Sequence, residues 1–337
     1  MQFTTPVDIP RSGLPISHSD RIALVGSCFA DNMGQMLDDC KFNTVRNPFG
    51  TLYNPLSIAW LLKRSIDEIP FNSQSDEIFM DEEGNWHSWM HHTKFSCCSA
   101  EELVMKMNLA GIAMAETLKT ARVLIVTFGT AIIYTLKNNG KLVANCHKQK
   151  DSLFERRMLS TNEIAEKWTS LIEQLHEKNP YLRIILTISP IRHKRDGMHV
   201  NQLSKSTLLL GVDQLIKQFQ MGTSKPHLEH FPSYEIMMDE LRDYRFYADD
   251  MIHPSPLAIQ HIWERFSDTH FDKDTKSLCN QCIQIQKALA HKTDNPASNA
   301  YKSFIENTLK QIETIKKRHP YIRMEKEIEI CNTRLRK

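Results

Sequence analysis

The sequence predicts an α/β fold, a parallel sheet covered by helices on both faces, followed by a helical C-terminal extension. The apolar runs at 22–25, 122–127 and 183–188 are continuous rather than alternating, as is typical of strands buried on both faces. Amphipathic segments separate these runs, and strands that alternate with helices form parallel sheets. A charged segment without strands after residue 272 predicts the extension.

The predicted elements alternate along the first part of the chain. They are strands at 22–25, 42–46, 122–127 and 183–188, and helices at 31–40, 55–66, 101–120, 161–178, 201–221 and 254–266. Gly26 ends the first strand, the turn at 47–50 ends the second, and Asn179–Pro180 ends the helix before the last strand. Pro55 suits the first turn of a helix. The helix at 161–178 carries an apolar stripe at helical spacing, formed by Ile164, Trp168, Leu171, Ile172 and Leu175.

The chain is predicted to divide into two parts. Residues 1–271 form the α/β domain, and residues 272–337 form the helical extension, which packs on that domain or on a second subunit of a homo-oligomer. Between about 70 and 100, acidic, polar and aromatic residues alternate, and Asp81–Gly84 predicts a hairpin turn. We interpret this stretch as a segment inserted into the domain, placed to cover part of it.

Composition excludes several classes of partner. The 42 basic and 40 acidic side chains give a net charge of +2, too small a field to predict binding to nucleic acid. No run approaches the roughly 18 apolar residues of a membrane span, and the first 20 residues lack the apolar segment of a signal peptide. The eight scattered cysteines indicate free thiols in a reducing compartment. We expect a cytoplasmic protein.

Two motifs at opposite ends of the α/β segment predict an active site. Gly26-Ser27 falls where the first strand ends and a helix begins, and open parallel sheets bind ligands outside the carboxyl ends of their strands. A nucleophilic serine needs such exposure, a base within reach and amides that stabilise an oxyanion. The alternative is that Ser27 only caps the following helix.

The second motif is Asp250-Met-Ile-His253-Pro254. An Asp three residues before a His can hold the imidazole by one ring nitrogen while the other nitrogen faces a nucleophile. The predicted roles are nucleophile for Ser27, base for His253 and orienting carboxylate for Asp250. The alternative is a surface loop in which Asp250 caps the next helix. Together the two motifs predict a serine hydrolase.

The run Gly26-Ser-Cys-Phe-Ala30 resembles the signature of the GSCFA-domain family, a bacterial branch similar to the SGNH/GDSL hydrolases. Further stretches resemble that family in the same order, at 47–55, 127–130, 145–148, 189–193 and 250–254. The resemblance covers roughly the first 270 residues. It implies a three-layer, flavodoxin-like sandwich, ester hydrolysis (often of an acyl group on a carbohydrate or lipid), and Ser27, Asp250 and His253 as the catalytic set.

The resemblance also implies oxyanion donors. They are the amides of Ser27 and Gly50 and an Asn in a Gly-x-Asn motif, for which this chain has Gly129-Thr130-Ala131. Alanine has no side-chain donor, and a missing donor typically costs about 10²–10³ in turnover. Either Thr130 or another polar group takes its place, or the reaction differs. The other candidates are Asn47, Asn54, Asn145 and Asn201.

Several aromatic and cationic residues are interpreted as substrate contacts. Trp86 and Trp89 can stack on sugar rings, or alternatively pack within a lid. His91 and His92 lack neighbours at zinc spacing, so no metal site is predicted. The loop residues expected to face the same cleft are Asn47, His147, Arg192 and His193, of which the Arg suits a carboxylate or phosphate and the last His is the second choice for the base.

The cysteines are given structural roles. Cys279 and Cys282 have metal or redox spacing, but the second pair of a zinc site is missing, so we interpret them as buried packing residues. Cys28 follows the predicted nucleophile and is expected to turn inward.

These observations predict a serine esterase without metal or organic cofactor that acts on a small-molecule, glycan or lipid ester. Two alternatives stay open. The same catalytic set can pass the acyl group to a sugar hydroxyl, which makes an acyltransferase. The second alternative is a carbohydrate-binding protein of the same fold with weak turnover. Ala131 favours this alternative, because alanine lacks the oxyanion donor that an Asn would supply.

Overall fold

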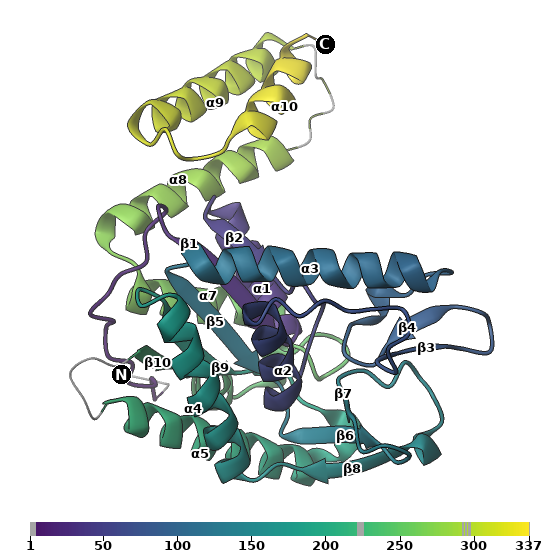
Figure 1. Cartoon of the computed structure of the whole chain (residues 1–337). Coiled ribbons are helices and arrows are strands. Elements are labelled where there is room, and N and C mark those ends of the chain that lie inside the picture. The colour runs from purple at the N-terminus through teal and green to yellow at the C-terminus, as the bar shows by residue number, and fades with distance from the viewer. Residues whose placement is uncertain (1–4, 221–225, 292, 294, 296–297, 337) are drawn as a thin grey trace.

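The computed structural model describes residues 5–220, 226–291, 293, 295 and 298–336. Its centre is a parallel sheet of five strands in the order β10-β9-β5-β1-β2 (Figure 1). The strands are β1 (Arg21–Gly26), β2 (Asn43–Arg46), β5 (Val123–Phe128), β9 (Arg183–Ile188) and β10 (His227–Phe231). Numbered along the chain, this is the flavodoxin-like order 2-1-3-4-5. The predicted fold class is confirmed.

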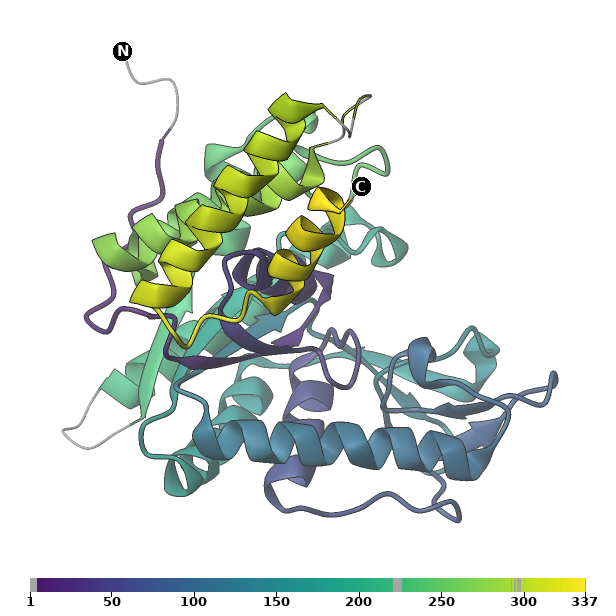
Figure 2. The same ribbon diagram turned by 90° about the horizontal axis from the view of Figure 1, so that it is seen from above.

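Helices cover both faces of the sheet, and Figure 2 shows α3 on one side and the C-terminal helices on the other. The helices of the α/β part are α1 (Cys28–Asp39), α2 (Pro55–Ile66), α3 (Ala100–Thr120), α4 (Thr161–Lys178), α5 (Met198–Gln220), α6 (Ser233–Glu235) and α7 (Pro256–His270). Successive side chains of β1 point to opposite faces of the sheet and so pack in two different hydrophobic cores. Ala23 and Val25 pack with α2 to α5, whereas Ile22 and Leu24 pack with α1 and α7.

Several helix boundaries differ from the predicted ones because capping residues decide them. Ser27 caps α1, which begins at Cys28 rather than at 31. Ser255 caps α7, which begins at Pro256 rather than at 254. The last residue of the predicted helix 201–221 lies outside the described residues, and α5 ends at Gln220.

Two small antiparallel sheets lie beside the main sheet at the same end of the molecule (Figure 1). One is the hairpin β3 (Ile78–Met80) and β4 (Trp86–Ser88), which confirms the predicted turn at 81–84. The other has the order β7-β6-β8 and was not predicted: β6 (Ile132–Leu136), β7 (Leu142–Val143) and β8 (Phe154–Met158). Trp89, Leu136, Val143 and Phe154 form one buried cluster that joins the two sheets.

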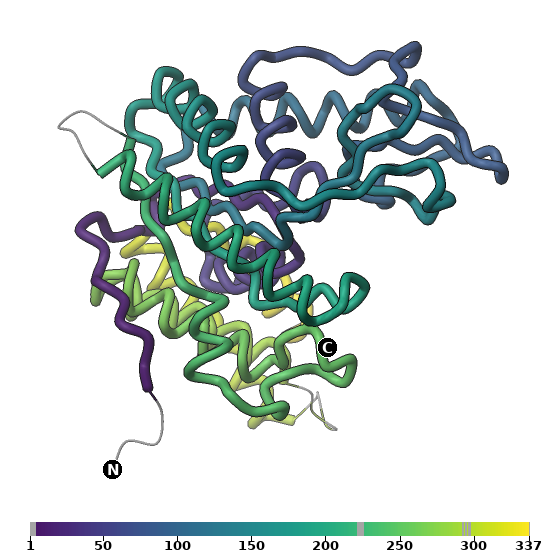
Figure 3. Tube along the Cα trace, turned by 90° about the horizontal axis from the view of Figure 1, so that it is seen from below, coloured from purple at the N-terminus to yellow at the C-terminus, as the bar shows by residue number. Residues whose placement is uncertain are grey.

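The described segments that precede β1 and follow α7 both pack on the α/β part. Ile16 pairs with Phe271 just before β1 begins, and Figure 3 shows the purple N-terminal segment running along the edge of the molecule. The extension consists of α8 (Lys273–Ala290), α9 (Asn299–Arg318) and α10 (Glu325–Leu335), with its own apolar core. Cys279 of α8 packs with α1, and Lys41 pairs with Glu327 of α10.

The boundary at 271/272 and the homo-oligomer stay predictions. Within the part of the chain that the structure describes, no helix combines the length and the apolar character that crossing a bilayer requires.

Candidate active site

The first strand ends in a tight elbow that presents the start of α1. Gly26 has φ +134°, and a Cβ there would lie 2.1 Å from the carbonyl oxygen of Thr127 on the neighbouring strand. Glycine therefore lets β1 and β5 stay paired up to the turn. These two strands form the switch point of this strand order, where flavodoxin-like sheets bind their ligands.

Ser27 is the N-cap of α1. Its hydroxyl accepts a hydrogen bond from the amide of Phe29 at 3.3 Å, and its own amide donates to Thr127 at 3.1 Å. The residue is 1% exposed. The capping role that was the alternative interpretation of Ser27 is present in this conformation. Its role as nucleophile stays a prediction.

Cys28 is the first residue of α1, and the expectation that it turns inward is wrong. Its side chain lines a cleft, and its Sγ lies 3.7 Å from Nε2 of His253. Burial raises the pKa of the Cys28 thiol, whereas hydrogen bonds from the amides of Cys28 and Phe29 act in the opposite direction. The thiol, and not the neighbouring hydroxyl, is the group that faces the imidazole.

Asp250 and His253 lie together on the loop before α7. Oδ2 of Asp250 is 2.6 Å from Nδ1 of His253, and Oδ1 accepts the amides of Ile252 and His253 at 2.9 Å each. The hydrogen bonds from His253, backbone and side chain, lower the pKa of the Asp250 carboxyl to about 2. An ionised carboxylate only accepts, so Nδ1 carries the hydrogen and Nε2 of the neutral ring is free to accept a proton.

Arg192 fixes this loop against the sheet. Its guanidinium donates to the carbonyl of Met251, and it lies 4.3 Å from the ring centre of Tyr247 and 5.7 Å from that of Tyr244. Met251 has φ +58°, a left-handed conformation that the loop must stabilise. Arg192 was predicted to contact substrate. It lines the cleft and in addition holds the segment that carries His253.

The cleft has a volume of about 350 Å³ and lies at the carboxyl end of the sheet. Its lining includes Cys28, Tyr53, Thr130, Arg192, His193 and His253. A second hollow of about 660 Å³ adjoins it and shares Tyr53, Tyr134, Ala144 and Arg195. Cationic side chains such as Lys148 and Lys194 line the two hollows, together with the imidazoles of His147 and His193.

The other predicted substrate contacts divide into two groups. His193 lines the cleft, and burial lowers its pKa to about 4. His147 lines the adjoining hollow, with Nε2 2.7 Å from the carbonyl of Ser88. Asn47 is 2% exposed and accepts the amide of Gly26 at 2.8 Å, which makes it a support of the elbow. Trp86 lies in β4 against the main core and lines neither hollow.

The predicted oxyanion donors already have acceptors within the fold. The amide of Ser27 donates to Thr127, and that of Gly50 donates to Asn47 at 2.8 Å. The hydroxyl of Thr130 lies 2.9 Å from that of Ser204, while its amide donates to Tyr53. In this conformation none of these three amides is free.

Lys205 is a feature of the site that sequence reasoning missed. Its side chain is fully buried behind the cleft, and Nζ donates to the carbonyls of Gly129 at 2.7 Å and Ser189 at 2.6 Å. These residues follow β5 and β9, so Lys205 ties the carboxyl ends of two strands together. Burial lowers the pKa of the Lys205 ammonium to about 7. The sequence could have indicated this burial, because Lys205 lies at helical spacing from Leu208 and Val212 and so falls on the apolar face of the predicted helix.

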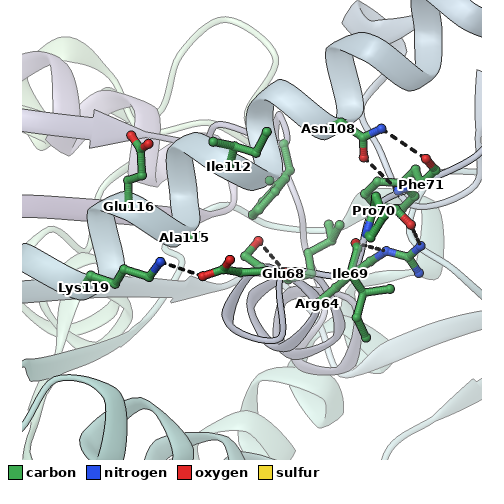
Figure 4. Close-up of a pocket in the computed structure, with 14 residues that line it drawn as sticks. Arg64, Glu68, Ile69, Pro70, Phe71, Asn108, Ile112, Ala115, Glu116 and Lys119 are labelled. Carbon is green, nitrogen blue, oxygen red and sulfur yellow. Dashed lines mark hydrogen bonds and ion pairs between the residues drawn. The ribbon is translucent and has the colours of Figure 1, made fainter.

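Another cavity, of about 290 Å³, lies between α2 and α3 (Figure 4). Its rim carries an ion pair between Glu68 and Lys119, and Asn108 bonds the backbone of Phe71. Histidine and cysteine are missing from its lining, and so are all the predicted site residues. Among the described residues, no group of three or more His, Cys, Asp or Glu side chains is arranged to hold a metal ion.

Fold and site together define a flavodoxin-like α/β protein with an Asp–His pair at the switch point of its sheet. The model of the GSCFA family matches residues 21–266, and that of the GSCFA domain protein, C-terminal domain, matches residues 283–337. The chain belongs to the GSCFA family. The second match covers the segment for which the sequence motifs gave no resemblance.

The comparison with curated proteins finds no match. Among solved structures, an acetyl xylan esterase from the rumen bacterium Butyrivibrio proteoclasticus matches with 11% sequence identity and a TM-score of 0.37. The match covers 76% of this chain and 64% of that chain, so this chain spans less than two thirds of that protein's length.

Proposed function

We propose that this protein is an acyl-ester hydrolase of the SGNH/GDSL kind, which removes an acyl group from a carbohydrate or lipid. The observation that carries the proposal is the 2.6 Å contact between Asp250 and His253, with the opposite ring nitrogen directed at the first turn of α1. His253 is the base, and Asp250 fixes its tautomer. The nucleophile comes from the elbow formed by Ser27 and Cys28.

The surroundings of the cleft support an ester with polar or anionic character. Arg192, Lys194 and Arg195 line it, and Lys148 lines the adjoining hollow. Arg195 pairs with Asp151 at 2.8 Å and Arg192 is held by the loop, so Lys148 and Lys194 are the more adaptable cations. A carboxylate, phosphate or sugar hydroxyl on the substrate fits such a lining.

The test is ester hydrolysis by the full chain. p-Nitrophenyl acetate and an acetylated oligosaccharide serve as substrates, and His253→Gln is expected to lower kcat/KM by about 10²–10⁴-fold. The matched control is His227→Gln, because this exposed histidine lies at the amino-terminal end of β10, the opposite end of the sheet. Equal, measurable rates for the parent and His253→Gln would rule out His253 as the base and so the mechanism proposed here.

Acyl transfer is a second candidate, and the larger hollow beside the cleft favours it because an acceptor sugar has room there. Transfer differs from hydrolysis only in which hydroxyl meets the acyl-enzyme. The two are separated by adding a free glycan to the ester assay and measuring acylated glycan against free acid. Ester turnover absent from parent and variants alike would instead indicate a binding protein of this fold.

A further inference from the structure

We propose that the acyl-enzyme of this protein is a thioester on Cys28, and not an ester on Ser27. The proposal rests on the hydrolase function proposed above and deepens it. It starts from the geometry of the elbow, where Sγ of Cys28 lies 3.7 Å from Nε2 of His253 and lines the cleft.

The hydroxyl of Ser27 is engaged at the N-terminus of α1. It accepts the amide of Phe29 within α1, and the residue is 1% exposed. To reach His253, the hydroxyl would have to rotate out of the cap and leave a helix amide without its acceptor. Ser27 is thereby a positioning residue, because it fixes where α1 begins and so which side chain follows the turn.

The imidazole is held in the tautomer that can act on the thiol. Asp250 accepts the hydrogen on Nδ1, so Nε2 carries the lone pair that faces sulfur. The contact is therefore one in which S–H donates to Nε2. This is the Cys–His–Asp form of the arrangement that serine hydrolases build with a hydroxyl.

The environment of sulfur explains why a base is required. Burial raises the pKa of the Cys28 thiol, so the group is protonated at neutral pH. The amides of Cys28 and Phe29 and the Lys205 ammonium act in the opposite direction and stabilise negative charge there. Charge on sulfur thus develops when His253 accepts the proton, during attack on the substrate.

The reaction balances without an external oxidant or reductant. His253 takes the thiol proton while sulfur attacks the ester carbonyl carbon, and the C–S bond forms as the carbonyl electron pair moves to oxygen. When the C–O bond breaks, the alcohol leaves with the proton from Nε2. Water then gives a proton to His253 and attacks the thioester, the C–S bond breaks, sulfur recovers the proton, and the carboxylic acid is released.

The first-turn amides of α1 supply oxyanion stabilisation in this arrangement. The Cys28 amide begins the helix, and amides at that position have no partner within the helix. The predicted donors at Ser27 and Gly50 are occupied by Thr127 and Asn47. A nucleophile at residue 28 places the oxyanion near the Cys28 amide, which in the resting state hydrogen-bonds the Cys28 sulfur and does not donate to the neighbouring strand.

The experiment traps the acyl-enzyme. The full chain is mixed with p-nitrophenyl acetate, quenched in acid, and digested to locate the acetyl group by mass spectrometry. We expect it on Cys28 in the parent and in Ser27→Ala, and on residue 28 as an oxygen ester in Cys28→Ser. Cys28→Ala should lose the adduct and on the order of 10³-fold or more in kcat/KM. Cys98→Ala is the control, because Cys98 is exposed on the inserted segment.

An acetyl group on Ser27, or full turnover by Cys28→Ala, overturns the assignment to Cys28 and leaves the hydrolase in place. Alkylation by iodoacetamide gives a readout that needs neither ester turnover nor a folded Cys28 variant. Cys28 should be alkylated faster in the parent than in His253→Gln, with the alkylation rate of Cys98 in the same sample as the internal reference. If hydrolysis is absent but this dependence on His253 is present, the hydrolase fails and the activated thiol stands. If neither is present, both proposals fail.

Discussion

Replacing Gly26 with Ala tests whether the elbow is built as the structure indicates. The new Cβ would lie 2.1 Å from the carbonyl oxygen of Thr127 and 2.8 Å from its carbonyl carbon. These are backbone atoms of the neighbouring strand, so the methyl group cannot be accommodated by a side-chain rotation. The backbone must leave φ +134°, or β1 and β5 must separate at their carboxyl ends.

The expected loss of stability has two parts. The conformation alone costs about 1–3 kcal/mol, because only glycine adopts it readily. The clash adds to this, and we expect a total of at least about 3 kcal/mol. Gly140→Ala is the control for the conformational part, because Gly140 has φ +69° but nothing within 4 Å of a new Cβ. That control should lose about 1–2 kcal/mol.

The assay is unfolding in urea, monitored by tryptophan fluorescence. kcat/KM is measured separately, without urea, on folded protein. Displacement of the elbow by about 1 Å should lower kcat/KM on the order of 10²-fold. Gly140→Ala should keep the activity of the parent. If both variants lose the same free energy of unfolding, the clash with Thr127 is absent and the elbow is built differently.

Three further predictions concern buried or positioning residues. Arg192→Ala frees the Met251 carbonyl and should lower kcat about tenfold, while the free energy of unfolding in urea changes by less than about 1 kcal/mol. An unchanged kcat would contradict the positioning role of Arg192. Burial lowers the pKa of His91 to about 3, so the unfolded state takes up its proton first and stability should fall as pH drops below about 6.5, by about 1.4 kcal/mol per unit. Urea midpoints that stay constant from pH 7 to 5 would refute this. For Lys205, with its pKa lowered to about 7, the unfolded state holds more protons between pH 7 and 10, so stability should rise with pH in the parent and rise less in Lys205→Met.

The elements that could be predicted are those whose pattern is local. β1, β5 and β9 are buried on both faces and leave continuous apolar runs in the sequence. β10 was missed because His227, Glu229 and His230 interrupt its apolar character, as is common at the edge of a sheet. The sheet of β6, β7 and β8 was missed because its strands are short and partly exposed, so they leave no continuous apolar run in the sequence.

Within the site, the Asp250–His253 contact follows from a spacing of three residues and could be predicted. The direction of the elbow side chains could not. It depends on whether α1 begins at Cys28 or three residues later, because each helical residue turns the side chain by about 100°. A cap at Ser27 places the hydroxyl in the helix end and the thiol in the cleft. Boundary positions are the least determined by apolar periodicity, and here one such position decides the chemistry.

The central claim is that Asp250 and His253 act as one unit on an acyl ester. A double-mutant cycle tests it most directly, with kcat/KM measured for the parent, Asp250→Asn, His253→Gln and the double variant. If the carboxylate acts through the imidazole, the double variant should lose no more than His253→Gln alone, within about threefold. Losses that multiply would mean that the two side chains work separately, and an undiminished rate in all three variants would mean that the pair takes no part in catalysis.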